Sequence, residues 1–295
     1  MSLSDPLAAV SGASGARSSR HESFLAYGGF RYLKLAAATA VLSLVIYLVD
    51  RPYGGRYGGS WAGYVLGTAG ALLILWLTWF GYRKRTYAED HGRLAARLSA
   101  HVYLGLSLIV IATLHTGFHF GWNVHTLAYA LMCVVIASGT FGVWCYARYP
   151  RLMTENRSNQ TMQQMLSRIA SLNDELRGRA MPLDDATAGL IGRAVEATGI
   201  GGSVWRQISG RYPGCTTAAA IAGMDASSAA AGPEHEEDRR QIRVLLDEKA
   251  NLLGRIRRDI SLKAMMEVWL YFHVPFSFAL LAALLAHVVS VFFLW

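Results

Sequence analysis

The chain has 295 residues, of which 53% are hydrophobic and only 16% are charged. An ordinary soluble domain carries about 25% charged residues, so this composition indicates a membrane protein rather than a soluble enzyme. The net charge of +8 does not require a nucleic-acid partner, because the basic residues follow a membrane topology.

Residues 1–30 are rich in Ser, Gly and Ala and contain no apolar signal-peptide core, which predicts a disordered cytoplasmic tail. Long apolar blocks follow. About 20 apolar residues in a helix cross a hydrocarbon core of about 30 Å, so each block predicts a transmembrane helix. The blocks are Leu33–Val49, Trp61–Tyr82, His101–Phe120, Val124–Tyr146 and Ala264–Trp295.

These blocks predict an all-α integral membrane protein, a bundle of five transmembrane helices, with helices one to four in residues 31–146 and helix five in 264–295. Only Arg51 and Arg56, among 28 basic residues, lie in segments on the opposite side from the N-terminus. Because short cytoplasmic segments are enriched in Lys and Arg, we expect a cytoplasmic N-terminus and a periplasmic C-terminus in a bacterial inner membrane.

Residues 147–263 form a cytoplasmic insert between helices four and five. Apolar positions at helical spacing predict one amphipathic helix over Thr154–Arg177 and another from Glu236 into helix five. The composition of residues 178–235 predicts a loosely ordered tip. The insert has no nucleotide-binding fingerprint and no C-x-x-C pair, and its cysteine, Cys215, is interpreted as inert.

Two apolar helices each carry a pair of histidines with the same spacing. HVYLGLSLIVIATLH runs from His101 to His115, and HVPFSFALLAALLAH runs from His273 to His287. Fourteen residues fall about 40° short of four full turns, so each pair lies on nearly one helix face, about 21 Å apart. Ionisable residues inside a membrane are costly and are usually functional.

The predicted topology makes helices three and five parallel, so the pairs His101/His273 and His115/His287 lie near the inner and outer faces respectively. A pair of neutral imidazoles is the ligand set of a six-coordinate haem iron. The sequence therefore predicts two bis-histidine b-type haems. The alternative interpretation is that the histidines only make hydrogen bonds between helices.

The paired H-x13-H motifs resemble the transmembrane domain of the ferric reductases and NADPH oxidases, in which matching helices hold two stacked haems. The cytochrome b of quinol:cytochrome c oxidoreductases has a similar spacing. The resemblance covers the helical part of the chain and implies ligand roles for the four histidines alone. Neither the flavin and nicotinamide domains nor a glutamate-containing quinol-oxidation motif is found, so partners or quinone must supply and remove electrons.

Other residues are candidates for contacts with the haem propionates or a quinone. At the outer boundary these are His119 and His125, and at the inner boundary they are Arg97 and Lys263. His119 also competes with His115 as a ligand, since it lies four residues further on. Interfacial anchoring is the alternative interpretation of all four. Gly105 and Gly117 are candidates for close porphyrin approach, and Pro275 for a local kink.

The predicted function is electron transfer across the membrane by a di-haem b cytochrome, a subunit of an oxidoreductase complex rather than a complete enzyme. The expected partners are a cytoplasmic-side or membrane redox subunit docking on residues 147–263 and an outer-face c-type cytochrome or iron-sulfur protein. The alternatives are a quinol-oxidising or quinone-reducing membrane anchor of a dehydrogenase complex, and a haem-free structural subunit.

Overall fold

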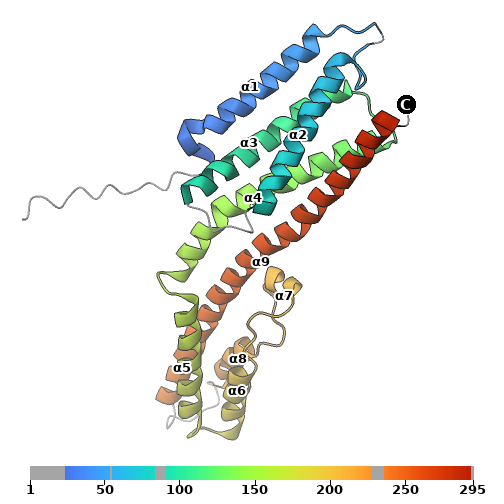
Figure 1. The fold of residues 1–295 in the computed structure, drawn as a ribbon. Helices are drawn as coiled ribbons and strands as arrows, with labels where there is room; N and C mark the ends of the chain where they lie inside the picture. The colour runs from blue at the N-terminus through green and yellow to red at the C-terminus, as the bar shows by residue number, and fades with distance from the viewer. Residues whose placement is uncertain (1–23, 54, 84–90, 228–235, 294–295) are drawn as a thin grey trace, which may run out of the picture. The chain divides into compact units, whose positions relative to one another are not determined.

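The computed structural model describes residues 24–53, 55–83, 91–227 and 236–293. Within these ranges the regular elements are all helices and no β-strand is present, as the sequence predicts (Figure 1). The chain divides into two units, Met1–Tyr129 and Ala130–Trp295.

In the first unit, α3 (His91–Thr116) packs against both α1 (Tyr27–Val49) and α2 (Trp61–Arg83). The short 3-10 helix Phe24–Ala26 leads into α1, and Gly28, Gly29 and Phe30 have left-handed φ values, so the first turn is kinked. Residues 24–30, assigned to a disordered tail by composition, are therefore structured. The rest of the predicted tail, residues 1–23, lies outside the described residues.

The loop between α1 and α2 is held by its own polar groups. The Asp50 carboxylate accepts a hydrogen bond from the backbone N–H of Ala62 (3.1 Å) in the first turn of α2. The Arg56 guanidinium donates to the carbonyl of Asp50 (3.0 Å) and lies over the Tyr47 ring, 4.8 Å from its centroid. These bonds satisfy backbone groups that the ends of α1 and α2 leave without helical partners.

The second unit contains most of α4 (Val124–Arg157) and then α5 (Met162–Ala180), α6 (Asp185–Glu196), α7 (Val204–Ser209), α8 (Thr217–Ser227) and α9 (Glu236–Phe293). With 58 residues, α9 extends for about 87 Å. It runs without interruption through Pro275 and joins residues 147–263 to the fifth apolar block (Figure 1).

The predicted helix over Thr154–Arg177 is two helices. Ser158 and Asn159 both have left-handed φ values, which end α4 at Arg157. A capping box then starts α5, in which the Thr161 side chain accepts from the Gln164 N–H (3.1 Å) and the Gln164 side chain accepts from the Thr161 N–H (2.8 Å). T-x-x-Q ahead of an apolar pattern is the sequence signal that marks this boundary.

Residues 162–256 contain two apolar cores of buried side chains. Helices α5, α6, α8 and α9 share the first, which includes Leu176, Ile191, Ala220, Ile242 and Leu246. Helices α5 and α9 form the second, from Met165, Ile169, Leu172, Leu252, Leu253 and Ile256. The expectation of a loosely ordered tip was wrong for residues 178–227, which form α6, α7 and α8, whereas 228–235 lie outside the described residues.

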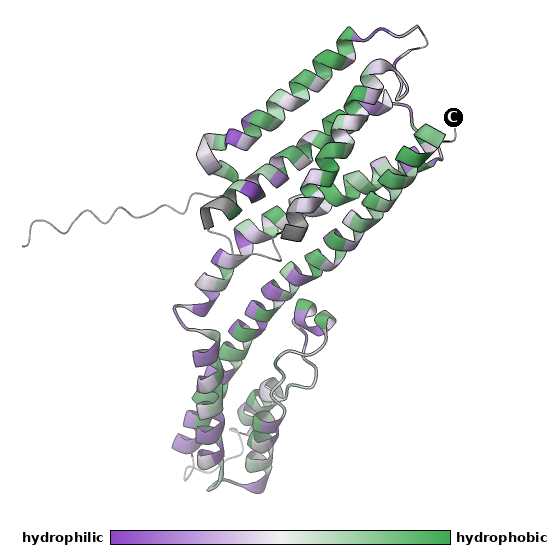
Figure 2. Ribbon diagram, viewed as in Figure 1, coloured by the Kyte–Doolittle hydropathy of each residue, from purple (hydrophilic) through white to green (hydrophobic). Residues whose placement is uncertain are grey.

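In the part of the chain that the structure describes, five helices are long and apolar enough to cross a membrane. They are Phe24–Val49, Trp61–Trp79, Leu94–Thr116 and parts of Val124–Ala180 and Glu236–Phe293. Figure 2 shows apolar residues along α1, α2, α3 and the C-terminal half of α9, and mixed polarity on α5, α6 and the N-terminal half of α9. These helices place the chain among multi-pass membrane proteins.

Candidate functional site

The four candidate ligands occupy two continuous helices. His101 and His115 lie in α3, and His273 and His287 lie in α9. All four are half-buried. Since neither helix is interrupted between its two histidines, the spacing of fourteen residues corresponds to a rise of about 21 Å along each helix.

His115 lies in the last turn of α3 and faces a glycine-lined stretch of α2. Its Nδ1 is 2.7 Å from the carbonyl oxygen of Gly63. A side chain added at Gly67, one helical turn further on, would place its Cβ 2.7 Å from Cε1 of the imidazole. The ring therefore occupies space that exists only because α2 has glycine at these positions.

The Gly63 carbonyl determines which nitrogen of His115 carries the proton. A carbonyl oxygen can only accept a hydrogen bond, so Nδ1 must be the protonated nitrogen. In the neutral ring the lone pair then lies on Nε2. A backbone carbonyl bonded to the second ring nitrogen is a common way of orienting a metal-binding histidine.

His273 is held in the same manner by α4. Its Nδ1 is 2.8 Å from Oγ of Ser138, and that hydroxyl donates its single proton to the carbonyl of Val135 (2.8 Å). Since the Ser138 proton is committed, Ser138 accepts from His273, and Nδ1 again carries the ring proton. The neutral His273 ring therefore also has its lone pair on Nε2.

Small residues of α4 and an aromatic residue of α9 surround His273. The Cβ of any side chain at Gly139 would lie 3.3 Å from Cε1 of the His273 ring, and one at Gly142 would collide with Trp269. Trp269 donates from Nε1 to the Ser138 carbonyl (2.6 Å), and its ring centroid is 5.2 Å from that of His273. Ser138 thus binds both aromatic rings.

Sequence reasoning missed these supporting residues and chose other glycines. A Cβ at Gly105 would meet only Leu77, at 4.0 Å, and Gly117 has a left-handed φ of +57° and closely approaches the carbonyl of Arg56. Gly117 is thus needed for the turn that ends α3. The patterns G-x-x-x-G at Gly63 and S-G-x-x-G at Ser138 are the signals that could have been noticed.

His119 does not share a helix face with His115. Because α3 ends at Thr116, His119 lies in the exposed turn that follows, where its N–H donates to the Thr116 carbonyl (3.1 Å). The expectation that His119 competes as a ligand from the same helix face was therefore wrong. His125 is half-buried in the first turn of α4.

The two inner-boundary candidates occupy different environments. Arg97 is half-buried in α3, one turn before His101. Lys263 is exposed on α9, and its ammonium lies 3.9 Å from the Glu267 carboxylate. Their contact with propionates stays a prediction, as does the pairing of the histidines of α3 with those of α9.

The side chains of Lys249 and Cys215, which lie outside the apolar segments, have shifted pKa values. The Lys249 side chain is completely buried on α9, and burial lowers its pKa to about 8, while its Nζ donates to the Asn173 side chain and the Ala194 carbonyl (2.7 Å each). Burial raises the pKa of Cys215, but hydrogen bonds from the backbone at Gly199 and Thr217 outweigh this effect and lower it to about 7. The Cys215 thiol is thus more acidic than an inert cysteine.

The described residues contain no group of three or more His, Cys, Asp or Glu side chains placed to hold a metal ion. An axial pair on a haem iron is a set of two ligands, so that finding does not bear on it. The chain matches no known family model, no curated protein and no solved structure.

Proposed function

We propose that this protein is a b-type cytochrome subunit that carries electrons across the membrane. His101 and His273 would hold one haem, and His115 and His287 the other. The observation that carries the proposal is the matching arrangement of His115 and His273, each with Nδ1 bonded to an oxygen acceptor and the lone pair of the neutral ring on Nε2.

The residues around these two rings suit axial ligation. The Gly63 carbonyl and the Ser138 hydroxyl orient the imidazoles and increase the basicity of Nε2. Gly67 and Gly139 leave room for the rings beside the helix backbones. The protein's part is to hold the nitrogens and exclude water, and bound haem would supply one-electron redox chemistry.

The proposed partners and membrane follow from the resemblance of this chain to the ferric reductase transmembrane domain. Electrons would enter and leave through partners: a cytoplasmic-side or membrane redox subunit on residues 147–263 and a c-type cytochrome or iron-sulfur protein at the outer face. The distribution of basic residues supports a bacterial inner membrane with a cytoplasmic N-terminus and a periplasmic C-terminus.

The first test is a reduced-minus-oxidised absorption spectrum of the purified full chain, with a pyridine haemochrome count per polypeptide. We expect two b-type haems per chain. His115→Ala and His287→Ala should each leave one haem, and the remaining haem should have the same spectrum in both variants. His119→Ala is the matched control and should keep both haems, because His119 is exposed outside α3.

A second test separates a haem ligand from a packing histidine. Ser138→Ala removes the acceptor for His273 Nδ1, and loss of such a partner typically weakens metal binding about 10- to 100-fold. We expect weaker haem retention and a shifted midpoint potential for one haem, with recovery in Ser138→Thr. No haem in a folded, membrane-inserted preparation would contradict the proposal and reassign His115 and His273 to helix packing.

A further inference from the structure

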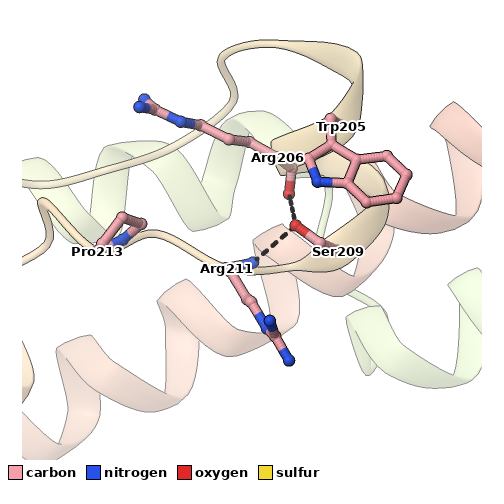
Figure 3. Close-up of a pocket in the computed structure, with 5 residues that line it drawn as sticks. All are labelled: Trp205, Arg206, Ser209, Arg211 and Pro213. Atoms are coloured by element: carbon pink, nitrogen blue, oxygen red, sulfur yellow. Dashed lines mark hydrogen bonds between the residues drawn. The ribbon is translucent and has the colours of Figure 1, made fainter.

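The α7 helix and the loop after it form an exposed surface with basic and aromatic side chains. Trp205, Arg206, Ser209, Arg211 and Pro213 line an open hollow of about 490 Å³ (Figure 3). Trp205 is 77% exposed. An exposed tryptophan alone is ordinary on a protein surface, but one beside two exposed arginines has the composition typical of a surface at the membrane boundary.

Three contacts fix the segment carrying this surface to α9. The Ser261 hydroxyl donates to the Ile208 carbonyl (3.2 Å). One turn earlier on α9, the Arg257 guanidinium donates to the Gly199 carbonyl (2.9 Å) and lies over the Tyr212 ring, 4.4 Å from its centroid. Arg257 and Ser261 thus hold α7 from both sides.

These contacts set the level of α7 along α9. Ser261 lies three residues, about 4.5 Å, before Ala264, where the apolar block of α9 begins. If that block spans the membrane, α7 lies at the level of the lipid headgroups. Tryptophan and arginine are the residues that protein surfaces place at this level.

The charge of this surface is positive. Arg206 and Arg211 form no ion pair with any residue in the described ranges, and both are exposed. Arg258 and Lys263 are also exposed on the neighbouring turns of α9. Figure 3 shows the guanidinium groups of Arg206 and Arg211 extending in different directions, as suits a broad anionic surface better than one small ligand.

We propose that the α7 surface binds the headgroups of anionic phospholipids in the leaflet on the side of residues 147–263. Trp205 would insert at the boundary between headgroups and acyl chains, and Arg206 and Arg211 would bind lipid phosphates. The proposal depends on the C-terminal part of α9 spanning the membrane, and it does not depend on haem.

The test uses the full chain in nanodiscs of neutral lipid or of neutral lipid mixed with brominated anionic lipid. The tryptophan fluorescence of wild type minus that of Trp205→Phe isolates the Trp205 signal. We expect bromine to quench this signal in the anionic discs. In neutral discs that carry the same bromine on the neutral lipid, we expect much weaker quenching.

Arg206→Gln/Arg211→Gln should weaken the quenching, because each basic residue near an anionic surface strengthens binding roughly five-fold. The matched control is Arg177→Gln/Arg240→Gln, which removes two exposed charges, one of them about 36 Å from Ala264 along α9, and should behave as wild type.

Two results would overturn the proposal. The first is equal quenching in neutral and anionic discs, unchanged by the Arg206/Arg211 substitutions. The second is an equivalent change of the Trp205 signal on adding inorganic phosphate to neutral discs at constant ionic strength, which would assign the surface to a soluble anion. The haem count, measured on the same samples, tests the proposed function separately.

Discussion

Helices α1–α3 and helices α5, α6, α8 and the first half of α9 use apolar side chains in opposite ways. In α1–α3 many large side chains are exposed, as at Leu42 (59%) and Leu72 (62%), and several buried positions hold small residues such as Ala36 and Ala62. Residues 162–256 instead bury many large side chains in two cores, such as Leu172, Leu176 and Ile256. The first pattern suits lipid as solvent, and the second suits water.

The two regions also satisfy their buried polar groups differently. Ser43 and Ser107 in the apolar helices donate to carbonyls of their own helix, those of Thr39 and Leu104. Residues 147–263 instead use contacts between distant segments, such as those of the buried Lys249 with the Asn173 side chain and the Ala194 carbonyl. Lipid offers no water for unsatisfied groups, so local satisfaction within a helix is favoured there.

The largest effect is expected at the ion pair between Arg157 at the end of α4 and Asp259 on α9. Arg157 Nε donates to the Asp259 carboxylate (2.7 Å), whose side chain is only 1% exposed. Arg157→Met should destabilise the fold by about 3–5 kcal/mol, because it leaves a buried carboxylate without its partner. Arg157→Met/Asp259→Leu should recover most of this loss, as measured by the free energy of unfolding of the full chain in detergent.

The same leucine-to-alanine change at Leu172 and at Leu72 tests the comparison directly. Leu172 is completely buried between α5 and α9, so Leu172→Ala should cost about 2–5 kcal/mol in detergent. Leu72→Ala should have little effect, since that side chain is 62% exposed on a helix expected to face lipid. Equal losses at both positions would contradict the assignment of different solvents to the two regions.

The pH dependence of stability is expected to come from Lys249. Its pKa is lowered from 10.5 to about 8 by burial, so the unfolded chain binds the proton more tightly than the folded one. Stability should therefore rise with pH between about 8 and 10.5. Lys249→Met should remove the part of this rise above about pH 9, measured as the change in thermal midpoint between pH 9 and 10.5.

Cys215 contributes in the same direction at lower pH. Its pKa falls from 9.0 to about 7 in the fold, so stability should rise between about pH 7 and 9 and be lost as the pH falls through 7. This part should persist in Lys249→Met and be absent in Cys215→Ser. A flat profile in wild type would show that neither group is held as the structure indicates.

A small loss of stability is expected from a substitution at the N-terminus of α5. Thr161→Ala removes a side-chain acceptor for the Gln164 N–H and should cost about 1 kcal/mol in the free energy of unfolding. Thr161→Ser keeps the hydroxyl and serves as the control. A loss as large as that of Leu172→Ala would mean that the break between α4 and α5 matters as much as the apolar core.

Much of the fold follows from the sequence because its causes are local. Apolar blocks of sufficient length predict the five candidate spans, and helical periodicity predicts the buried faces of α5 and α9, including Ile169, Leu172 and Ile242. The placement of His101 with His115 on α3, and of His273 with His287 on α9, follows from the same periodicity of the helix.

What the tertiary structure decided depends on contacts between segments far apart in the chain. The sequence does not show that Gly63 would bind His115, that Ser138 would bind His273, or that Lys249 would be buried against Ala194. Nor could composition identify α6 and α8, which share a core with α5 and α9, or α7, which has no buried residue. Hydropathy and helical periodicity are properties of the sequence of each segment. Burial and hydrogen-bond partners depend instead on which other segments pack against it.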